Sequence, residues 1–282
     1  MKNHKNKILI PAVIITSALL LSAEFNTTRL EKISESMNLK TLESLPVKAN
    51  RAFKEGEFIT YRMHYGALNA GVASLEVKPE IIEVNNRKVY HIVTTGYSTG
   101  ATDVFFKVRD RYETYMDKDA LIPWLFVRRV NEGGCSFSQD YAFNHYTHKV
   151  DIGKNKTVDI PDGIQDMVSS FYSARNMDFN KASVGDVFSF NCFLDREVWP
   201  FKIKFMGREE IETDIGKFKA LRFCPIVQRG RVFKREEDLN VWISDDDNHI
   251  VLRAQAHVIV GNIKMDITSA KNLANDWGRV YN

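Results

Sequence analysis

The chain has 282 residues, of which 44% are hydrophobic and 11% aromatic, and its 39 Lys and Arg residues stand against 36 Asp and Glu residues. That composition excludes a disordered or low-complexity protein, because it supplies enough apolar surface for a full core. The net charge of +3 comes entirely from Lys2, Lys5 and Lys7, since the next charged residue is Glu24. The rest of the chain is neutral, so no global positive field draws in nucleic acid or an anionic membrane.

Residues 1–23 have the layout of a secretory signal peptide. The three lysines precede an apolar run from Ile8 to Leu21, and small residues follow at the expected cut after Ala23. The run is shorter than the roughly 20 residues of a bilayer span and contains Pro11, so cleavage is favoured over a retained anchor. We therefore expect an exported protein of the periplasm or outer envelope, with no transmembrane segment in the mature chain.

The segment 24–53 is expected to form a helix or a mobile leader into the domain. Leu30, Ile33 and Met37 recur at near-helical spacing, and Pro46 ends the pattern. A single β-rich domain is then expected over residues 54–282.

From residue 57 onward hydrophobic residues recur at every second position, which is the spacing of a half-buried strand. Ile59 and Tyr61 share one face, and Gly66 and Gly71 bracket a turn that predicts a hairpin. Further strands are predicted at residues 88–97, 109–116, 121–130, 135–145, 187–194, 198–206, 217–227, 239–244, 250–259 and 263–270. Such regular short strands predict large curved antiparallel sheets that form a partly open barrel or a sandwich.

One segment, at about residues 162–177, has helical spacing instead. Its apolar residues fall at i, i+3, i+4, i+7 and i+8 from Ile164, and Asp162 or Asp166 can cap the first turn. We expect one main amphipathic helix here, packed by its apolar stripe on a concave sheet face.

The three cysteines, Cys135, Cys192 and Cys224, are too few for a disulfide scaffold. Cys192 and Cys224 lie in strand-like runs and are interpreted as small buried hydrophobes. One disulfide remains the alternative, because an exported protein meets an oxidising environment.

Several short motifs together resemble a known family. They are Gly56-Glu57-Phe58 with Gly71-Val72-Ala73 in the opening hairpin, Asp110-Arg111-Tyr112-Glu113 in a later strand, the helical run from Ser169 to Arg175, and Trp242-Ile243-Ser244 followed by Gly261-Asn262-Ile263. The pattern, which extends from about Lys54 to the C-terminus, is similar to an exported bacterial family known only as a domain of unknown function, DUF3108. The resemblance implies an envelope protein built on curved antiparallel sheets, and it supplies no catalytic residues.

A basic row is the candidate binding surface. Positions 107, 109 and 111 share one strand face by the period of two, and aromatic residues lie between and after them. Such a row suits an anionic glycan or a lipid head group, with aromatic faces for stacking. The alternative is a solvated face whose arginines pair with Asp110 and Glu113. The candidate ligand-binding residues are Lys107, Arg109, Arg111, Tyr112, Trp124, Arg129 and Trp242.

Three other motifs carry weaker hypotheses. Gly96-Tyr97-Ser98-Thr99-Gly100 fits the pattern of a nucleophilic serine elbow, but no upstream oxyanion motif accompanies it, so a glycine-flanked strand end is favoured. Asp245, Asp246 and Asp247 could bind calcium, yet a hairpin turn explains them better. His145 and His148 are three residues apart, so on a strand they would point to opposite faces, and their spacing does not predict a zinc site.

The leading functional hypothesis is a non-enzymatic binding or carrier protein for an apolar or glycan ligand, held in a curved sheet that the helix partly plugs. The first alternative is an envelope hydrolase or glycan-active enzyme that pairs Asp246 with Glu113 or Asp110. The second is a structural or assembly protein that docks an envelope partner through a sheet edge or aromatic patch. No cofactor is implied.

Overall fold

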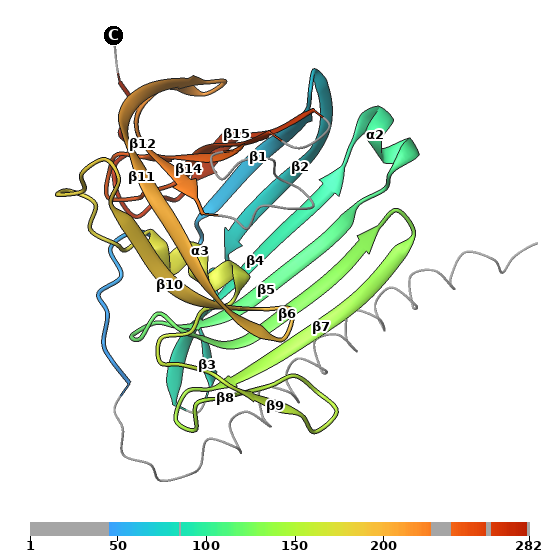
Figure 1. Cartoon of the computed structure of the whole chain (residues 1–282), viewed down its shortest axis with the longest axis vertical. Coiled ribbons are helices and arrows are strands. Elements are labelled where there is room, and N and C mark those ends of the chain that lie inside the picture. The colour runs from blue at the N-terminus through green and yellow to red at the C-terminus, as the bar shows by residue number, and fades with distance from the viewer. Residues whose placement is uncertain (1–44, 85, 227–237, 258–260, 281–282) are drawn as a thin grey trace, which may run out of the picture.

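The computed structural model describes residues 45–84, 86–226, 238–257 and 261–280. The expected signal peptide and most of the expected N-terminal leader, up to residue 44, lie outside these ranges. Within them the fold is mainly β, as predicted, and its strands form one antiparallel sheet (Figure 1). None of the helices in the described ranges is long and apolar enough to cross a bilayer.

The sheet has fifteen strands in these ranges. They are β1 (Phe58–Tyr65), β2 (Leu68–Val77), β3 (Ile82–Val84), β4 (Arg87–Ser98), β5 (Arg109–Asp117), β6 (Pro123–Glu132), β7 (Cys135–Asn144), β8 (Lys149–Asp151), β9 (Thr157–Asp159), β10 (Val187–Leu194), β11 (Glu197–Thr213), β12 (Gly216–Pro225), β13 (Leu239–Ser244), β14 (Val251–His257) and β15 (Asn262–Lys271). Most long strands match the predicted ones, but β11 continues to Thr213, beyond the predicted end at residue 206. The three-residue strands β3, β8 and β9 were not predicted.

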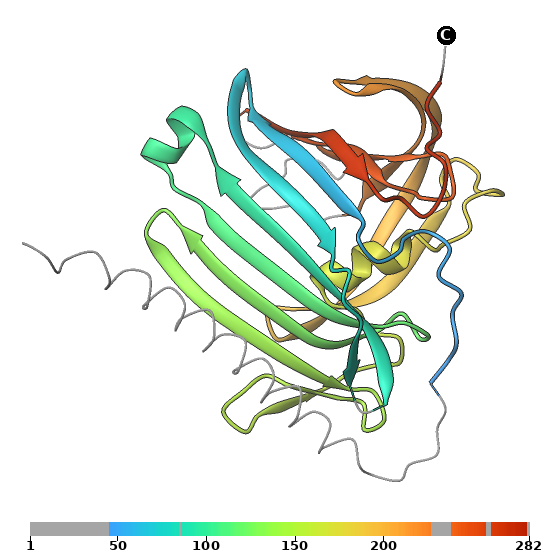
Figure 2. The same ribbon diagram turned by 180° about the vertical axis from the view of Figure 1, so that it is seen from behind.

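The sheet curves into a partly open barrel. Its hydrogen-bonded order runs from β10 through β15 to β1, β2 and β4, and then to β9, with β3 on the edge of β4. Residues 160–166 cross from β9 back to β10, where Gln165 exchanges backbone hydrogen bonds with Asn191 and Phe193. Figures 1 and 2 show the two halves of the sheet on either side of a helix that lies in the concavity.

That helix, α3 (Met167–Ala174), is shorter than the predicted 162–177. Asp166 is its N-cap and accepts hydrogen bonds from the backbone N–H groups of Val168 and Ser169, both at 2.7 Å. The residues before Asp166 instead connect β9 to β10, because the backbone of Gln165 is hydrogen-bonded to β10 and not to the helix. A second short helix, α2 (Gly100–Phe105), was not predicted.

Two hydrophobic clusters meet at α3. Val168 and Tyr172 are buried in the cluster that includes β4 to β7, while Phe171 contacts both that cluster and the one formed by β1 and β12 to β15. The apolar stripe of the helix is therefore covered by a concave sheet face, as its spacing predicted.

The described ranges include all three cysteines, and none forms a disulfide. Cys192 and Cys224 are buried, as predicted, while Cys135 is exposed. The disulfide alternative is therefore not what the structure shows.

Two strand glycines give a matched test of the packing between β2 and β4. A Cβ on Gly71 would lie 2.6 Å from the backbone oxygen of Tyr97, whereas a Cβ on Gly96 would meet no atom within 4 Å. Gly71→Ala is therefore expected to lower the free energy of unfolding by about 1 to 3 kcal/mol. Gly96→Ala should be neutral or stabilising by up to about 1 kcal/mol. Urea denaturation of both variants measures the two changes in the free energy of unfolding. Equal changes would contradict the close approach of Gly71 to the backbone of Tyr97.

Candidate ligand-binding cavity

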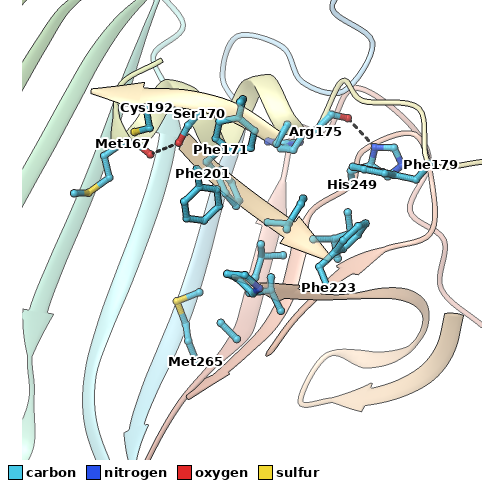
Figure 3. A pocket seen from close by; sticks show the side chains of 18 of the residues that line it. Met167, Ser170, Phe171, Arg175, Phe179, Cys192, Phe201, Phe223, His249 and Met265 are labelled. Atoms are coloured by element: carbon cyan, nitrogen blue, oxygen red, sulfur yellow. Dashed lines mark hydrogen bonds between the residues drawn. The ribbon is translucent and has the colours of Figure 1, made fainter. Parts of the chain in front are cut away.

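A cavity of about 390 Å³ lies between α3 and the inner faces of β10 to β15 (Figure 3). Its wall is almost entirely apolar, and it is rich in phenylalanine: Phe171, Phe179, Phe190, Phe201 and Phe223. Phe171 belongs to α3 and Phe179 to the segment after it, while the other three project from β10, β11 and β12. The volume lies within the range of about 300 to 1,000 Å³ that is typical of small-molecule sites.

Strand β10 forms one wall of the cavity, and apolar residues lie on both of its faces. Phe190, Cys192 and Leu194 alternate along it and face the cavity. The intervening Phe193 is fully buried on the opposite face, against Tyr141 of β7 with ring centroids 5.1 Å apart. The strand thus separates the cavity from the core of the first half of the sheet.

The few polar side chains on the cavity wall are already hydrogen-bonded to the protein. His249 Nδ1 lies 2.7 Å from the carbonyl oxygen of Arg175, and the Ser170 hydroxyl donates to the carbonyl of Met167 at 3.0 Å (Figure 3). Burial raises the pKa of the Cys192 thiol to about 12, so it stays protonated and is a poor nucleophile. The wall therefore offers a ligand mainly apolar contact.

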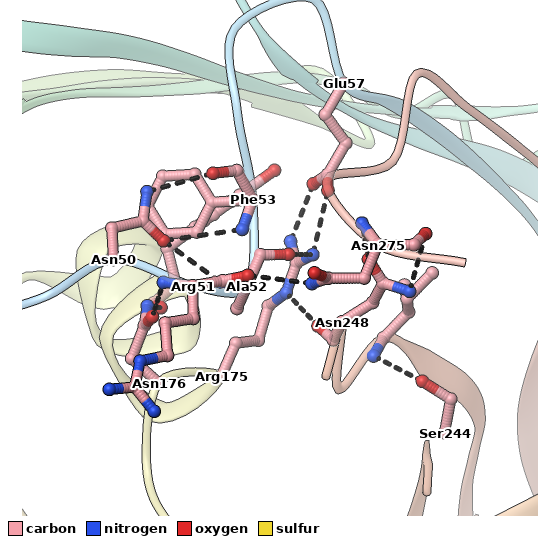
Figure 4. Close-up of polar contacts among 12 residues, drawn as sticks. Asn50, Arg51, Ala52, Phe53, Glu57, Arg175, Asn176, Ser244, Asn248 and Asn275 are labelled. Atoms are coloured by element: carbon pink, nitrogen blue, oxygen red, sulfur yellow. Dashed lines mark hydrogen bonds and ion pairs between the residues drawn. The ribbon is translucent and has the colours of Figure 1, made fainter. Parts of the chain in front are cut away.

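Arg175 is the charged residue of the wall, and its guanidinium lies in a polar cluster with Glu57, Ala52 and Asn248 (Figure 4). It makes two hydrogen bonds to the Glu57 carboxylate, at 2.6 and 2.8 Å, and donates to the carbonyl oxygens of Ala52 and Asn248, both at 2.8 Å. Both charged side chains are almost completely buried. The cluster ties the end of α3 to the N-terminal segment and to the turn between β13 and β14.

The predicted basic row lies elsewhere, on the outer face of the sheet. Arg109 pairs with Asp103, Arg111 with Glu113, and Arg129 with Asp140. Lys107 is exposed beside this row. Each arginine thus has an acidic partner, which agrees with the alternative of a solvated, ion-paired strand face.

Glu113 shows how strongly that outer face is paired. Burial alone would raise its pKa, but hydrogen bonds that the carboxylate accepts from His91 Nε2 and from Arg111, each at 2.7 Å, hold the pKa at about 2. The His91 ring stacks on Tyr115 with centroids 4.4 Å apart. The carboxylate is ionised at any physiological pH, so it is not a general acid.

The aromatic members of the predicted set do not join the basic row. Tyr112 follows Arg111 directly in β5 and packs on the inner face beside Arg128, whose guanidinium lies 5.5 Å from the ring centroid. Trp124 is fully buried and donates to Asp117 at 3.0 Å. Trp242 lies on β13, where it bonds Glu209, and five strands separate β13 from β5. The predicted residues therefore do not form one site.

The aspartate triplet forms the turn between β13 and β14. The Asp246 carboxylate accepts hydrogen bonds from the Ser244 hydroxyl and from the backbone of Asn248 and Gly278, at 2.8 to 2.9 Å, while Asp245 pairs with Arg208. No cluster of three or more metal-ligating side chains occurs in the described ranges. The partners of Asp246 are those of a turn residue.

Ser98 is followed by a helix, α2, which the sequence reading missed. Its hydroxyl is nevertheless buried and donates to Asp103 at 2.5 Å, while it accepts the backbone N–H of Val108 at 2.8 Å. A hydrogen bond from Arg109, then the one from Ser98, lowers the pKa of Asp103 to about 2. Ser98 thus closes the turn into β5, and its hydroxyl has Asp103 and Arg109, rather than a histidine, as side-chain partners.

Asp246, Glu113 and Asp110, the acids of the enzyme hypothesis, each have other hydrogen-bond partners. Asp246 is used by its own turn and by Gly278, and Glu113 by His91 and Arg111. Asp110 accepts the backbone N–H of Asn131 at 3.0 Å. These contacts place Asp246 on the β13–β14 turn and the other two acids on β5, so the fold does not build the proposed carboxylate pair from them.

The cavity-lining residues were missed because they come from distant parts of the chain. One signal was present: β10 reads Val-Phe-Ser-Phe-Asn-Cys-Phe-Leu, with apolar residues on both faces, which is typical of a strand covered on both sides. The apolar stripe of the predicted helix was the second signal, since it required a partner surface.

The fold is similar to that of several solved structures. A β-barrel-like protein of the domain of unknown function DUF1849 from Brucella abortus is 12% identical with a TM-score of 0.52, and the match covers 79% of this chain and 99% of that one. A candidate lipoprotein from Parabacteroides distasonis is 11% identical with a TM-score of 0.34, covering 81% and 100%. A candidate exported protein from Bacteroides fragilis is 11% identical with a TM-score of 0.30, covering 78% and 98%. Only the first likeness is close enough to support the fold.

No curated protein matches the sequence of this chain. The model of the family described as a protein of unknown function, DUF3108, matches residues 60–268, which is most of the chain and runs from within β1 to within β15. The chain therefore belongs to the DUF3108 family, as its scattered motifs indicated.

Proposed function

We propose that this protein is an exported, non-enzymatic binding or carrier protein that holds an apolar ligand, such as a hydrocarbon chain, in the cavity beneath α3. The observation that carries the proposal is the cavity of about 390 Å³, whose wall is apolar and whose polar side chains are bonded to the protein. The layout of residues 1–23 supports export.

The same wall favours an apolar ligand over a glycan. Sugar hydroxyl groups that leave water need new hydrogen-bond partners, and an unpaired buried hydroxyl costs about 1 to 3 kcal/mol. The Ser170 hydroxyl and His249 Nδ1 already have protein partners, and the Arg175 guanidinium is fully engaged with Glu57 and two carbonyls. A methylene group, in contrast, gains about 0.8 kcal/mol on burial.

The proposal predicts that filling the cavity weakens ligand binding. Ala174 lines the cavity on α3, while its neighbour Ser173 does not. Ala174→Trp is expected to weaken the binding of decanol at least tenfold, because the indole takes the place of the ligand. Displacement of the fluorescent dye anilinonaphthalene sulfonate from the purified protein measures the affinity.

Ser173→Trp is the matched control, since it adds the same ring on the same helix outside the cavity. It should bind decanol within about twofold of the wild type, and circular dichroism should show both variants folded. Undiminished binding by folded Ala174→Trp, or no binding by the wild type, would refute the proposed site.

A further inference from the structure

We infer that the ligand is longer than the cavity, and that its hydrocarbon chain continues onto an exposed apolar lane on the inner face of β13, β14, β15, β1 and β2. This inference rests on the proposed function and names the ligand class: a long-chain lipid. The lane consists of Leu239, Ala256, Ile263, Tyr65 and Leu68, one residue from each strand.

These five residues form a continuous row across the sheet. The register pairs Leu239 with Ala256, Ala256 with Ile263, Ile263 with Tyr65, and Tyr65 with Leu68. Five neighbouring strands at about 4.8 Å spacing give the row a length of about 19 Å. The row is thus long enough to carry an extended chain segment.

The lane adjoins the cavity directly. Val241, Ala254 and Met265 line the cavity, and each lies two positions from a lane residue on the same strand. Because side chains on a strand alternate between faces, a separation of two places both residues on the same inner face. A ligand in the cavity therefore meets the lane without crossing a polar side chain of these strands.

The lane has the composition of a covered surface, yet three of its five residues are exposed, while Leu239 and Ala256 are half-buried. The residues that neighbour the lane along each strand, on the outer face, are polar: Asn240, Gln255, Lys264, His64 and Asn69. Such alternation normally marks an apolar face that is covered. Leu68, Tyr65 and Ile263 are nevertheless 59%, 42% and 38% exposed. Because the lane is continuous with the cavity, we assign the rest of the same ligand as the group that covers it.

The test compares a short and a long uncharged chain, octanol and hexadecanol, as competitors for the dye on the full-length purified protein. Leu68→Glu with Ile263→Glu places two carboxylates on the lane and leaves the cavity intact. This double variant is expected to bind octanol within about twofold of the wild type and to lose at least tenfold in hexadecanol affinity. Asn69→Glu with Gln255→Glu adds the same charges on the outer face and should change neither affinity.

Each other outcome overturns a defined claim. If octanol binds and the lane variant keeps its hexadecanol affinity, the lane inference fails while the cavity proposal stands. If the wild type binds neither alcohol, both fail. If light scattering shows a wild-type dimer that the lane variant converts to a monomer, the lane is an interface between copies of this chain and the inference is overturned.

Discussion

Arg175→Met is expected to lower the free energy of unfolding by about 3 to 5 kcal/mol, the loss typical of breaking a buried ion pair. The variant leaves the Glu57 carboxylate buried without its partner, although both side chains of the native pair are 2% exposed or less. It also leaves the carbonyl oxygens of Ala52 and Asn248 without their donor. Urea denaturation monitored by tryptophan fluorescence measures the loss.

Arg62→Met is the control for the same substitution in an exposed ion pair. Arg62 contacts Asp214 at 3.1 Å, and the two side chains are 44% and 61% exposed. Exposed pairs contribute about 0 to 1 kcal/mol, so the control should be nearly neutral.

A double variant separates the cost of the unpaired charge from the loss of packing. Arg175→Met with Glu57→Leu removes both charges, so it should be less destabilised than Arg175→Met alone. A single variant that loses less than about 1 kcal/mol would show that the cluster in Figure 4 does not hold the end of α3.

Asp166→Asn is expected to change how stability depends on pH. Burial raises the pKa of Asp166 from 3.8 to about 6, against the hydrogen bonds from Thr114, Ser169 and Val168, which lower it. Between pH 4 and 6 the folded protein therefore binds more protons at this residue than the unfolded chain does. Its contribution to stability is complete below about pH 4 and is lost as the pH rises through about 6.

The size of this effect follows from the two pKa values. The difference between 3.8 and about 6 corresponds to about 3 kcal/mol. The asparagine of the variant does not titrate, and its side-chain oxygen can still accept the two cap hydrogen bonds. Because pH 4 is close to the unfolded pKa, most but not all of this difference is gained there, so the stability of the wild type relative to Asp166→Asn should increase by about 2 kcal/mol from pH 7 to pH 4.

The comparison with the variant is needed because His145 has the opposite effect. Burial lowers the pKa of His145 from 6.5 to about 4, so its contribution is lost as the pH falls from 6.5 to 4. The two residues offset each other in the wild type. Urea denaturation of both proteins at pH 4, 5, 6 and 7 isolates Asp166, and parallel curves would contradict its raised pKa.

The strands could be predicted from the sequence because their signals are local. Alternation at Ile59 and Tyr61, and turn glycines such as Gly66, specify a hairpin without knowledge of the rest of the fold. The limits of α3 could not be predicted in this way. Ile164 continues the helical spacing, but the backbone of Gln165 bonds to β10, which is a tertiary contact that overrides the local pattern.

The position of the cavity could not be predicted from the sequence, because it depends on the curvature of the whole sheet. Phe201 and Met265 are far apart in the chain, and only the order of the strands brings them to one wall. The separation of Arg111 from Tyr112 could have been foreseen, because adjacent residues of a strand face opposite ways. The burial of Trp124 could not be predicted from its local sequence, since it arises from packing against His145 and Tyr146.

The contacts of Arg175 also determine when the cavity can form during folding. They join α3 to Ala52 and Glu57 on one side and to Asn248 on the other, and Asn248 itself is held by Asn275 and Asp276. The pairing of β1 with β15 likewise joins residues more than 190 positions apart. Contacts of such long sequence separation form late and slowly. A chain that is synthesised from its N-terminus therefore completes the cavity only after nearly all of its residues have been made, so the cavity walls do not exist before the C-terminal strands pair.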